Sequence, residues 1–222
     1  MAKHGRSTIR HTNSIRINKE TVMSLQIMKK AMVGAIGAAA LMGAASAQAF
    51  TTVEYQNGSS TYVTGTSASD RDFSGATTLV ATVPIFGDIS VDCTLNLTGD
   101  VSVSGGQAFI DVTSGSVSGS GLCGLITLSG FPWYASDTAG GAAGVSDTPS
   151  PATADVSGFV NGIQVLIGGQ PSCGGTIPVV FSNGNPITAA SSFTFNDVIT
   201  GSGGCSVDGV LSSDTNEDTN AY

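Results

Sequence analysis

The stretch that decides the fold reads Val91-Asp92-Cys93-Thr94-Leu95-Asn96-Leu97-Thr98-Gly99-Asp100-Val101-Ser102-Val103. Apolar and polar residues alternate in it without a break through Thr98, which places Cys93 and the leucines on one face. This pattern is typical of a strand with one buried and one solvated side, in an antiparallel sheet that packs on a second sheet. A cysteine on the apolar face can tie the two sheets together.

Other segments of the same kind follow along the chain, bounded by Gly/Ser clusters and other turn residues. Between two apolar runs, Asn161-Gly162 predicts the turn of a β-hairpin. Further strands are expected at 78–83, 107–113, 122–128, 156–160, 163–167, 177–181, 193–199 and 205–211. About eight short antiparallel strands predict an all-β domain, either a two-sheet sandwich or a jelly-roll-like fold.

The first 49 residues are predicted to lie outside this domain. Residues 1–27 are basic and lack a sustained apolar period, so we interpret them as an upstream extension before the true start at Met28. Residues 28–49 contain Lys29-Lys30, an apolar run at 31–42 and Ala47-Gln48-Ala49, which are the parts of a cleaved signal peptide in the correct order. The run is too short to span a membrane, and the alternative is a short core helix. We therefore predict a secreted or cell-surface protein.

The exported part is expected to form one β domain at 50–213, with a mobile start at 50–77 and an acidic, disordered tail at 214–222. Seven of the eight Lys and Arg residues precede residue 50, and only Arg71 remains. One of the sixteen acids is lost with them, which gives residues 50–222 a net charge of 1 − 15 = −14. All histidines and methionines also precede residue 50.

This composition excludes several function classes. Binding to nucleic acid or to an anionic membrane surface needs several basic side chains. A Ser or Cys nucleophile normally needs a His or Lys base, so no catalytic residue and no cofactor is expected. Asp137-Thr138 and Asp147-Thr148 partly match the Asp-Thr-Gly of aspartic proteases, but Ala139 and Pro149 follow them in loop-like sequence. The acids at 70–72 and 214–218 match no calcium motif and are interpreted as solvated, so no metal site is expected.

Cysteines and aromatic residues supply the remaining candidates. Cys93, Cys123, Cys173 and Cys205 lack a C-x-x-C pair, which favours two disulfides in an exported chain. Three pairings are possible; sequence separation favours Cys93 with Cys123 and Cys173 with Cys205. A possible apolar contact is formed by Phe131, Trp133 and Tyr134, which surround a proline that interrupts sheet pairing. Alternatively, Trp133 fills one end of the core.

Four motifs follow one another along the chain: the inward cysteine before Thr94-Leu95-Asn96-Leu97-Thr98-Gly99, then Gly119-Ser120-Gly121-Leu122-Cys123, Phe131-Pro132-Trp133, and the closing stretch Gly204-Cys205-Ser206-Val207-Asp208-Gly209-Val210-Leu211-Ser212-Ser213. In these motifs the chain resembles the bacterial PraB-like family of alkane oxidation activators. The resemblance covers about 78–213. It implies a secreted or surface-attached protein that helps cells to use or adhere to hydrophobic substrates and to form biofilm.

The function expected from these observations is non-catalytic contact with a hydrophobic substrate or surface, with self-association or an adhesin as a further partner. The alternative is an extracellular fibre or pilus-like subunit. In that case a segment such as 51–56 would complete a sheet edge in the next copy by strand addition.

Overall fold

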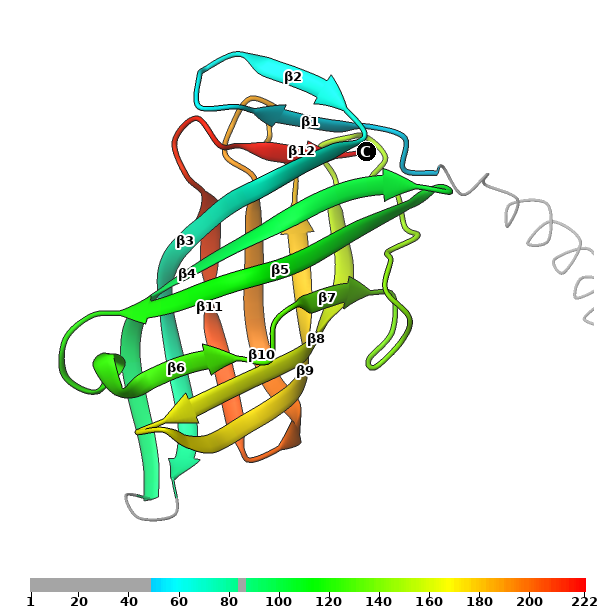
Figure 1. The fold of residues 1–222 in the computed structure, drawn as a ribbon. Helices are drawn as coiled ribbons and strands as arrows, with labels where there is room; N and C mark the ends of the chain where they lie inside the picture. The colour runs from blue at the N-terminus through cyan, green and yellow to red at the C-terminus, as the bar shows by residue number, and fades with distance from the viewer. Residues whose placement is uncertain (1–48, 84–86) are drawn as a thin grey trace, which may run out of the picture. The chain divides into compact units, whose positions relative to one another are not determined.

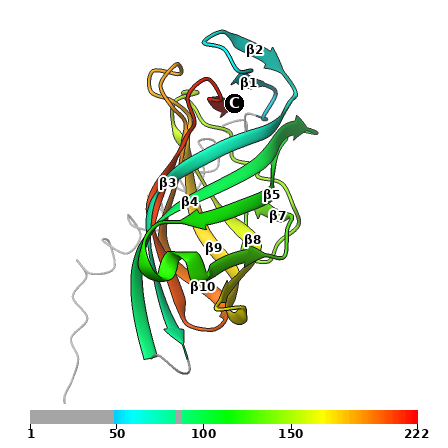
Figure 2. The ribbon, with the colours of Figure 1, turned by 60° about the vertical axis from the view of Figure 1, so that its left-hand side comes forward.

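A closed antiparallel barrel forms the body of the protein in the computed structural model, which describes residues 49–83 and 87–222 (Figures 1 and 2). The predicted extension and signal peptide therefore lie outside the described residues, except for Ala49. Eight strands form the ring in the order β3-β4-β5-β7-β8-β9-β10-β11, and β11 pairs with β3 to close it. Their bounds are β3 (Ser67–Val83), β4 (Gly87–Ser104), β5 (Gln107–Ser118), β7 (Trp133–Ser136), β8 (Asp155–Ile167), β9 (Gln170–Ser182), β10 (Ser192–Ser202) and β11 (Cys205–Ser213).

The all-β prediction is confirmed, but the sandwich or jelly-roll prediction is wrong. Two pairings account for the difference, because β8–β9 and β11–β3 join the ends of what would otherwise be an open sheet. Each strand of the ring then has a neighbour on both sides, and the shortest of these pairings joins β5 to β7 at Asp111 and Val112 only. A ring of this kind covers its own inner face, which removes the need for a second sheet. The inward faces of the strands then pack in two apolar clusters, of which the larger includes Leu97, Ile177 and Leu211.

The stretch 91–103 lies in β4, and its alternation is confirmed. Cys93, Leu97, Val101 and Val103 are all buried on the inner face. β4 is 18 residues long, far longer than the sequence pattern alone delimits, and pairs with β3 and β5. Length of this kind is what allows a strand to tilt and stagger around a barrel.

Asn161-Gly162 does not form a turn, contrary to the hairpin prediction. Both residues lie inside β8, where the pairing with β9 shifts register between Val160 and Ile163. Gly162 has a φ of +82°, so the backbone preference that suggested a turn serves a β-bulge instead. The actual turn between β8 and β9 contains Gly168 and Gly169, both with positive φ, as a two-residue hairpin loop requires.

A separate three-stranded sheet lies at one end of the barrel (Figure 1). It consists of β1 (Val53–Gln56), β2 (Tyr62–Gly65) and β12 (Thr219–Ala221), in the order β12-β1-β2. Val53 and Ala221 pack in one cluster with Val101 and Ala108 of the barrel. The structure thus differs from the predicted mobile start at 50–77 and disordered tail at 214–222, because β1 and β12 pair with each other.

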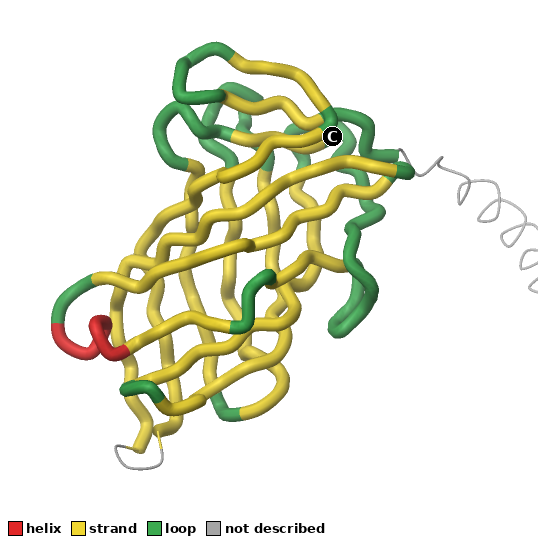
Figure 3. The backbone as a smooth tube through the Cα atoms, in the orientation of Figure 1, coloured by secondary structure: helices red, strands yellow, loops and turns green. Residues whose placement is uncertain are grey.

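The predicted strand at 122–128 is only partly correct. Its first half is a single turn of 3-10 helix, η1 (Gly121–Leu125), drawn in red in Figure 3. Its second half begins β6 (Ile126–Ser129), which pairs with β8 alongside β7. Within the described ranges, no helix is long and apolar enough to cross a membrane.

Candidate functional site

Two leucines project from the side of the barrel on η1. We call Gly121–Leu125 the leucine loop; Leu122 is 43% exposed and Leu125 is 47% exposed. The loop lies beside β4. At this position β4 no longer pairs with β5, because their pairing ends at Thr94 of β4. A surface leucine is unremarkable by itself, but two on one short turn form a small apolar protrusion.

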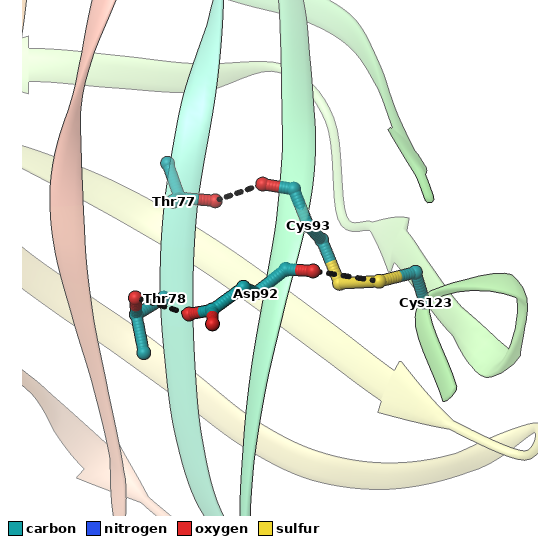
Figure 4. The surroundings of a disulfide bond; sticks show 5 residues. All are labelled: Thr77, Thr78, Asp92, Cys93 and Cys123. Carbon is teal, nitrogen blue, oxygen red and sulfur yellow. Dashed lines mark hydrogen bonds between the residues drawn. A yellow bond between two sulfur atoms is a disulfide. The ribbon is translucent and has the colours of Figure 1, made fainter. Parts of the chain in front are cut away.

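A disulfide fixes the leucine loop to the barrel (Figure 4). Cys123 is buried and is bonded to Cys93 on the inner face of β4, with a Cα–Cα distance of 5.7 Å. Gly119 precedes the loop with a φ of +141°, and a Cβ there would lie 2.9 Å from the sulfur of Cys123. Beside the bond, the Thr78 hydroxyl donates to Asp92 at 2.6 Å and joins β3 to β4. The disulfide therefore fixes the position of the loop, while Leu122 and Leu125 remain exposed to solvent.

The predicted pairing of the cysteines is confirmed. The second disulfide joins Cys173 on β9 to Cys205 on β11, with a Cα–Cα distance of 5.9 Å. Since β10 lies between these two strands, the bond crosses the strand that separates them. No cysteine is free among the described residues.

The leucine loop belongs to an uncharged stretch of a strongly acidic chain, and the acid beside its disulfide is the exposed Asp92 of β4. No charged residue occurs at 112–136, which includes the loop, β6 and β7, or at 156–196, which includes nearly all of β8 and all of β9. β6 pairs with β8 and β8 pairs with β9, so these segments form one continuous part of the barrel wall. Bringing an ionised group to an apolar phase is costly, so a contact with such a phase is favoured on this uncharged wall.

The structure buries one of the three residues of the predicted contact, Trp133, and leaves Phe131 and Tyr134 half-buried. Trp133 is 4% exposed, its indole N–H donates to the Ser129 carbonyl at 2.8 Å, and its ring stacks on Phe131 at 4.6 Å. It is therefore a core residue, as the alternative interpretation has it, and cannot meet a surface without rearrangement. Phe131 and Tyr134 are half-buried, and their part in a contact stays a prediction.

Residues of the leucine loop were missed as a site because 122–128 was interpreted as a continuous strand. In a continuous strand, Leu122 and Leu128 would both point into the core, so their apolar character would need no functional explanation. A signal was nevertheless present, because Gly121 and Gly124 flank Cys123. Gly121 has a φ of +65°, which a regular strand does not use.

A buried polar network holds the three-stranded sheet to the barrel. Asp218 is 4% exposed and accepts hydrogen bonds from the Tyr62 hydroxyl at 2.7 Å and the Ser191 backbone at 2.7 Å. It also accepts from the Ser213 hydroxyl at 2.9 Å and the Asn220 amide at 3.1 Å. Burial alone would raise the pKa of Asp218, but these hydrogen bonds outweigh burial and hold the pKa below its ordinary value of 3.8.

The hydrogen bond to Asp218 also changes the pKa of the Tyr62 hydroxyl. Burial and the hydrogen bond to Asp218 raise the pKa of Tyr62 above its ordinary value of 10.0, because an ionised phenol would face a carboxylate. Asp218 is thus a structural anion with satisfied hydrogen bonds. Nothing in its surroundings prepares it for proton transfer.

The lone basic residue of 50–222 is buried near this network. Arg71 is 8% exposed, and its guanidinium donates to the Ser69 carbonyl at 2.7 Å and the Gln56 carbonyl at 2.6 Å. It also lies over the Tyr55 ring, 5.5 Å from the centroid. Arg71 therefore joins β3 to β1 and offers no basic surface to a phosphate.

No arrangement for metal binding is found in the parts of the chain that the structure describes. No three His, Cys, Asp or Glu side chains there are grouped so that they could hold a metal ion. Asp137 accepts from the Ser146 backbone at 2.8 Å and thereby closes its own loop. Its contact is that of a turn residue rather than of half a catalytic pair.

A family model described as alkane oxidation protein activator PraA/PraB-like matches residues 25–219. The matched range contains every strand of the barrel ring and the leucine loop. It confirms the resemblance to PraB-like proteins on which the sequence interpretation drew. No curated protein and no solved structure matches the chain.

Proposed function

This chain belongs to the PraA/PraB-like family of alkane oxidation protein activators, and we propose that it is an exported, non-catalytic member that promotes contact with hydrophobic substrates. One observation carries the proposal: Leu122 and Leu125 are exposed on a loop that a disulfide fixes to β4, next to the uncharged wall formed by β6, β8 and β9. By the same contact the protein would support adhesion to apolar surfaces and biofilm formation.

Export is supported by the cysteines. Disulfides persist in oxidising compartments and are rare where thiols are kept reduced. Both disulfides here are buried and join segments that are 30 and 32 residues apart in the sequence. We therefore place the working protein outside the cytoplasm, at the bacterial surface or in the medium.

A non-catalytic role follows from the chemistry that residues 50–222 lack. They contain no His, Lys or Met, and their one Arg is buried. An enzyme built from this segment would have to use carboxylates alone. The buried carboxylate of Asp218 is held ionised by four hydrogen-bond donors, so it cannot act as a general acid near neutral pH.

The leucines can supply a useful but modest affinity. Complete burial of a leucine is worth about 1.5–3 kcal/mol, and each of these side chains still exposes close to half of its surface. Transfer of both into an apolar phase is then worth about 2 kcal/mol, or about 30-fold in partition. Many copies on one cell would multiply this weak contact.

The experiment is adsorption of the exported protein to hexadecane droplets, measured as its depletion from the aqueous phase. We expect the double variant Leu122→Ser/Leu125→Ser to adsorb about 30-fold more weakly than the wild type. Val63→Ser/Val210→Ser is the matched control, because these valines are 43% and 47% exposed on β2 and β11. Near-UV circular dichroism and the melting temperature should be unchanged in both variants.

Four outcomes would contradict the proposal. If the leucine variant adsorbs like the wild type, or if the valine control weakens adsorption equally, contact is not localised to the leucine loop. If the wild type does not adsorb, or if it turns over an ester, a glycoside or an alkane, the contact function or its non-catalytic character is wrong.

The fibre alternative gains no support from the fold. The segment suggested as a donor strand contains β1, which already pairs with β2 on one side and β12 on the other. Strand addition to another copy would require β1 to leave both partners.

A further inference from the structure

A small apolar cavity lies inside the barrel, near the end that the three-stranded sheet covers. Its volume is about 60 Å³. One wall is aromatic: Phe193 packs between Phe73 and Phe181, with ring centroids 4.8 Å and 4.9 Å away. The cavity is formed entirely by described residues, from Phe50 to Ala221.

The void exists because the inward residues of three neighbouring strands are small. Ala108 of β5, Ala135 of β7 and Gly158 of β8 all line it. An eight-stranded barrel has an interior that large side chains just fill. Small residues at one level therefore leave space that Phe73, Phe181 and Phe193 do not occupy.

The lining offers almost nothing to a polar ligand. Of the described residues that line the cavity, only Arg71 and Thr98 have polar side chains. The Arg71 guanidinium is bonded to backbone carbonyls of Ser69 and Gln56, and the Thr98 hydroxyl donates to Asp72. A buried water needs about two to four polar partners, and this lining supplies almost none.

We propose that this cavity is a binding site for a small, uncharged molecule without hydrogen-bonding groups, such as a short alkane. A cavity of about 150 Å³ lined by similar side chains accepts benzene or xenon. A volume of about 60 Å³ is less than half of that, so the site selects molecules of about two to four carbon atoms or a noble gas. This inference does not depend on the proposed contact through the leucine loop.

The test uses the exported protein with methyl-labelled side chains, titrated with propane and separately with xenon. We expect saturable chemical-shift changes at the methyl groups of Val101, Val160 and Val179, which line the cavity. Propionate, which has a short chain and a carboxylate, should cause no saturable change there. Binding of propionate in preference to propane would overturn the assignment of ligand class.

Matched variants localise the site. Ala135→Val and Ala108→Val each add two methyl groups to the void and should weaken propane binding at least tenfold. Ala76→Val adds the same groups on the outer surface of β3 and should leave binding unchanged. Two filling variants are used so that loss of folding in one does not decide the result.

A second cavity of about 50 Å³ provides an internal comparison. It lies near Cys93 and is lined by Val117 and Val207 among others. Propane shifts confined to those methyl groups, or shifts at Val101 and Val160 that persist in both filling variants, would overturn the proposal. The leucine-loop variant should bind propane normally, so failure of droplet adsorption and failure of this site are distinguishable.

Discussion

Replacing Asp218 by Asn should loosen the three-stranded sheet and lower the stability of the whole fold. The carboxylate accepts four hydrogen bonds, and the amide that replaces it has one acceptor oxygen. The new NH₂ group would face the Asn220 amide, so two donors would oppose each other. The bonds from Ser191 and Ser213 would also lose their charge assistance, which is worth about 1 kcal/mol each. We expect a loss of about 3 kcal/mol in the free energy of unfolding near pH 7.

The pH dependence of this loss follows from the sign of the pKa shift. The pKa of Asp218 is lower in the folded protein than its ordinary value of 3.8, so its contribution is fully present above that value. It is lost as pH falls through the folded pKa, because the carboxyl then takes up a proton in both states. The difference between wild type and Asp218→Asn should therefore be largest near neutral pH and shrink in strong acid.

The assay is urea unfolding followed by the fluorescence of Trp133, the single tryptophan, at about pH 7 and at about pH 2. Asp208→Asn is the control, because it removes the same charge from an exposed position on β11. The reasoning fails if Asp218→Asn costs no more than Asp208→Asn near neutral pH. It also fails if the cost grows as the solution is acidified.

Three further predictions concern the bulge, the disulfide and the start of the exported protein. Asn161→Ala should lower the free energy of unfolding in urea by about 3 kcal/mol, because the Asn161 side chain makes hydrogen bonds to Tyr134, Ser136, Gly140 and Thr176. Asn57→Ala, at an exposed position, is the control, and equal losses in the two variants would contradict the structural role of the bulge. Replacing Cys93 and Cys123 by Ser should cost about 4 kcal/mol for a sequence separation of 30, and an unchanged urea midpoint would refute this. N-terminal sequencing of exported protein should begin at Phe50, and a retained Met28 would refute the predicted cleavage.

The sequence predicted what depends on neighbouring residues. Alternation in 91–103 correctly predicted a strand with Cys93, Leu97 and Val101 on its buried face. The disulfide pairing was correct because sequence separation happened to reflect proximity in the ring. The closed ring was not predictable in the same way, because β11–β3 pairs residues more than a hundred positions apart. Alternation shows which face is buried but not which strand lies alongside.

The hairpin prediction was wrong because one backbone preference is compatible with two different structures. Asn161-Gly162 has the positive-φ tendency of a hairpin turn, and a β-bulge uses the same tendency. The polar tail looked disordered because Asp218, Thr219 and Asn220 have no apolar character to drive burial. Their burial depends on partners such as Ser191 and Tyr62, which no local pattern connects to them.

Under the proposed function, the charge distribution favours contact with an apolar phase at one part of the barrel. With one buried cation among fifteen acids in 50–222, ion pairs can contribute little, and stability must come from ring closure, the core and the disulfides. The acids repel other copies and are costly to bring near a low-dielectric phase. An apolar contact is therefore favoured where acids are few, and the leucine loop belongs to an uncharged stretch with Asp92 of β4 beside its disulfide. Placing one carboxylate beside it, as in Thr127→Asp on β6, should weaken droplet adsorption while leaving both leucines in place, and unchanged adsorption would refute this electrostatic argument.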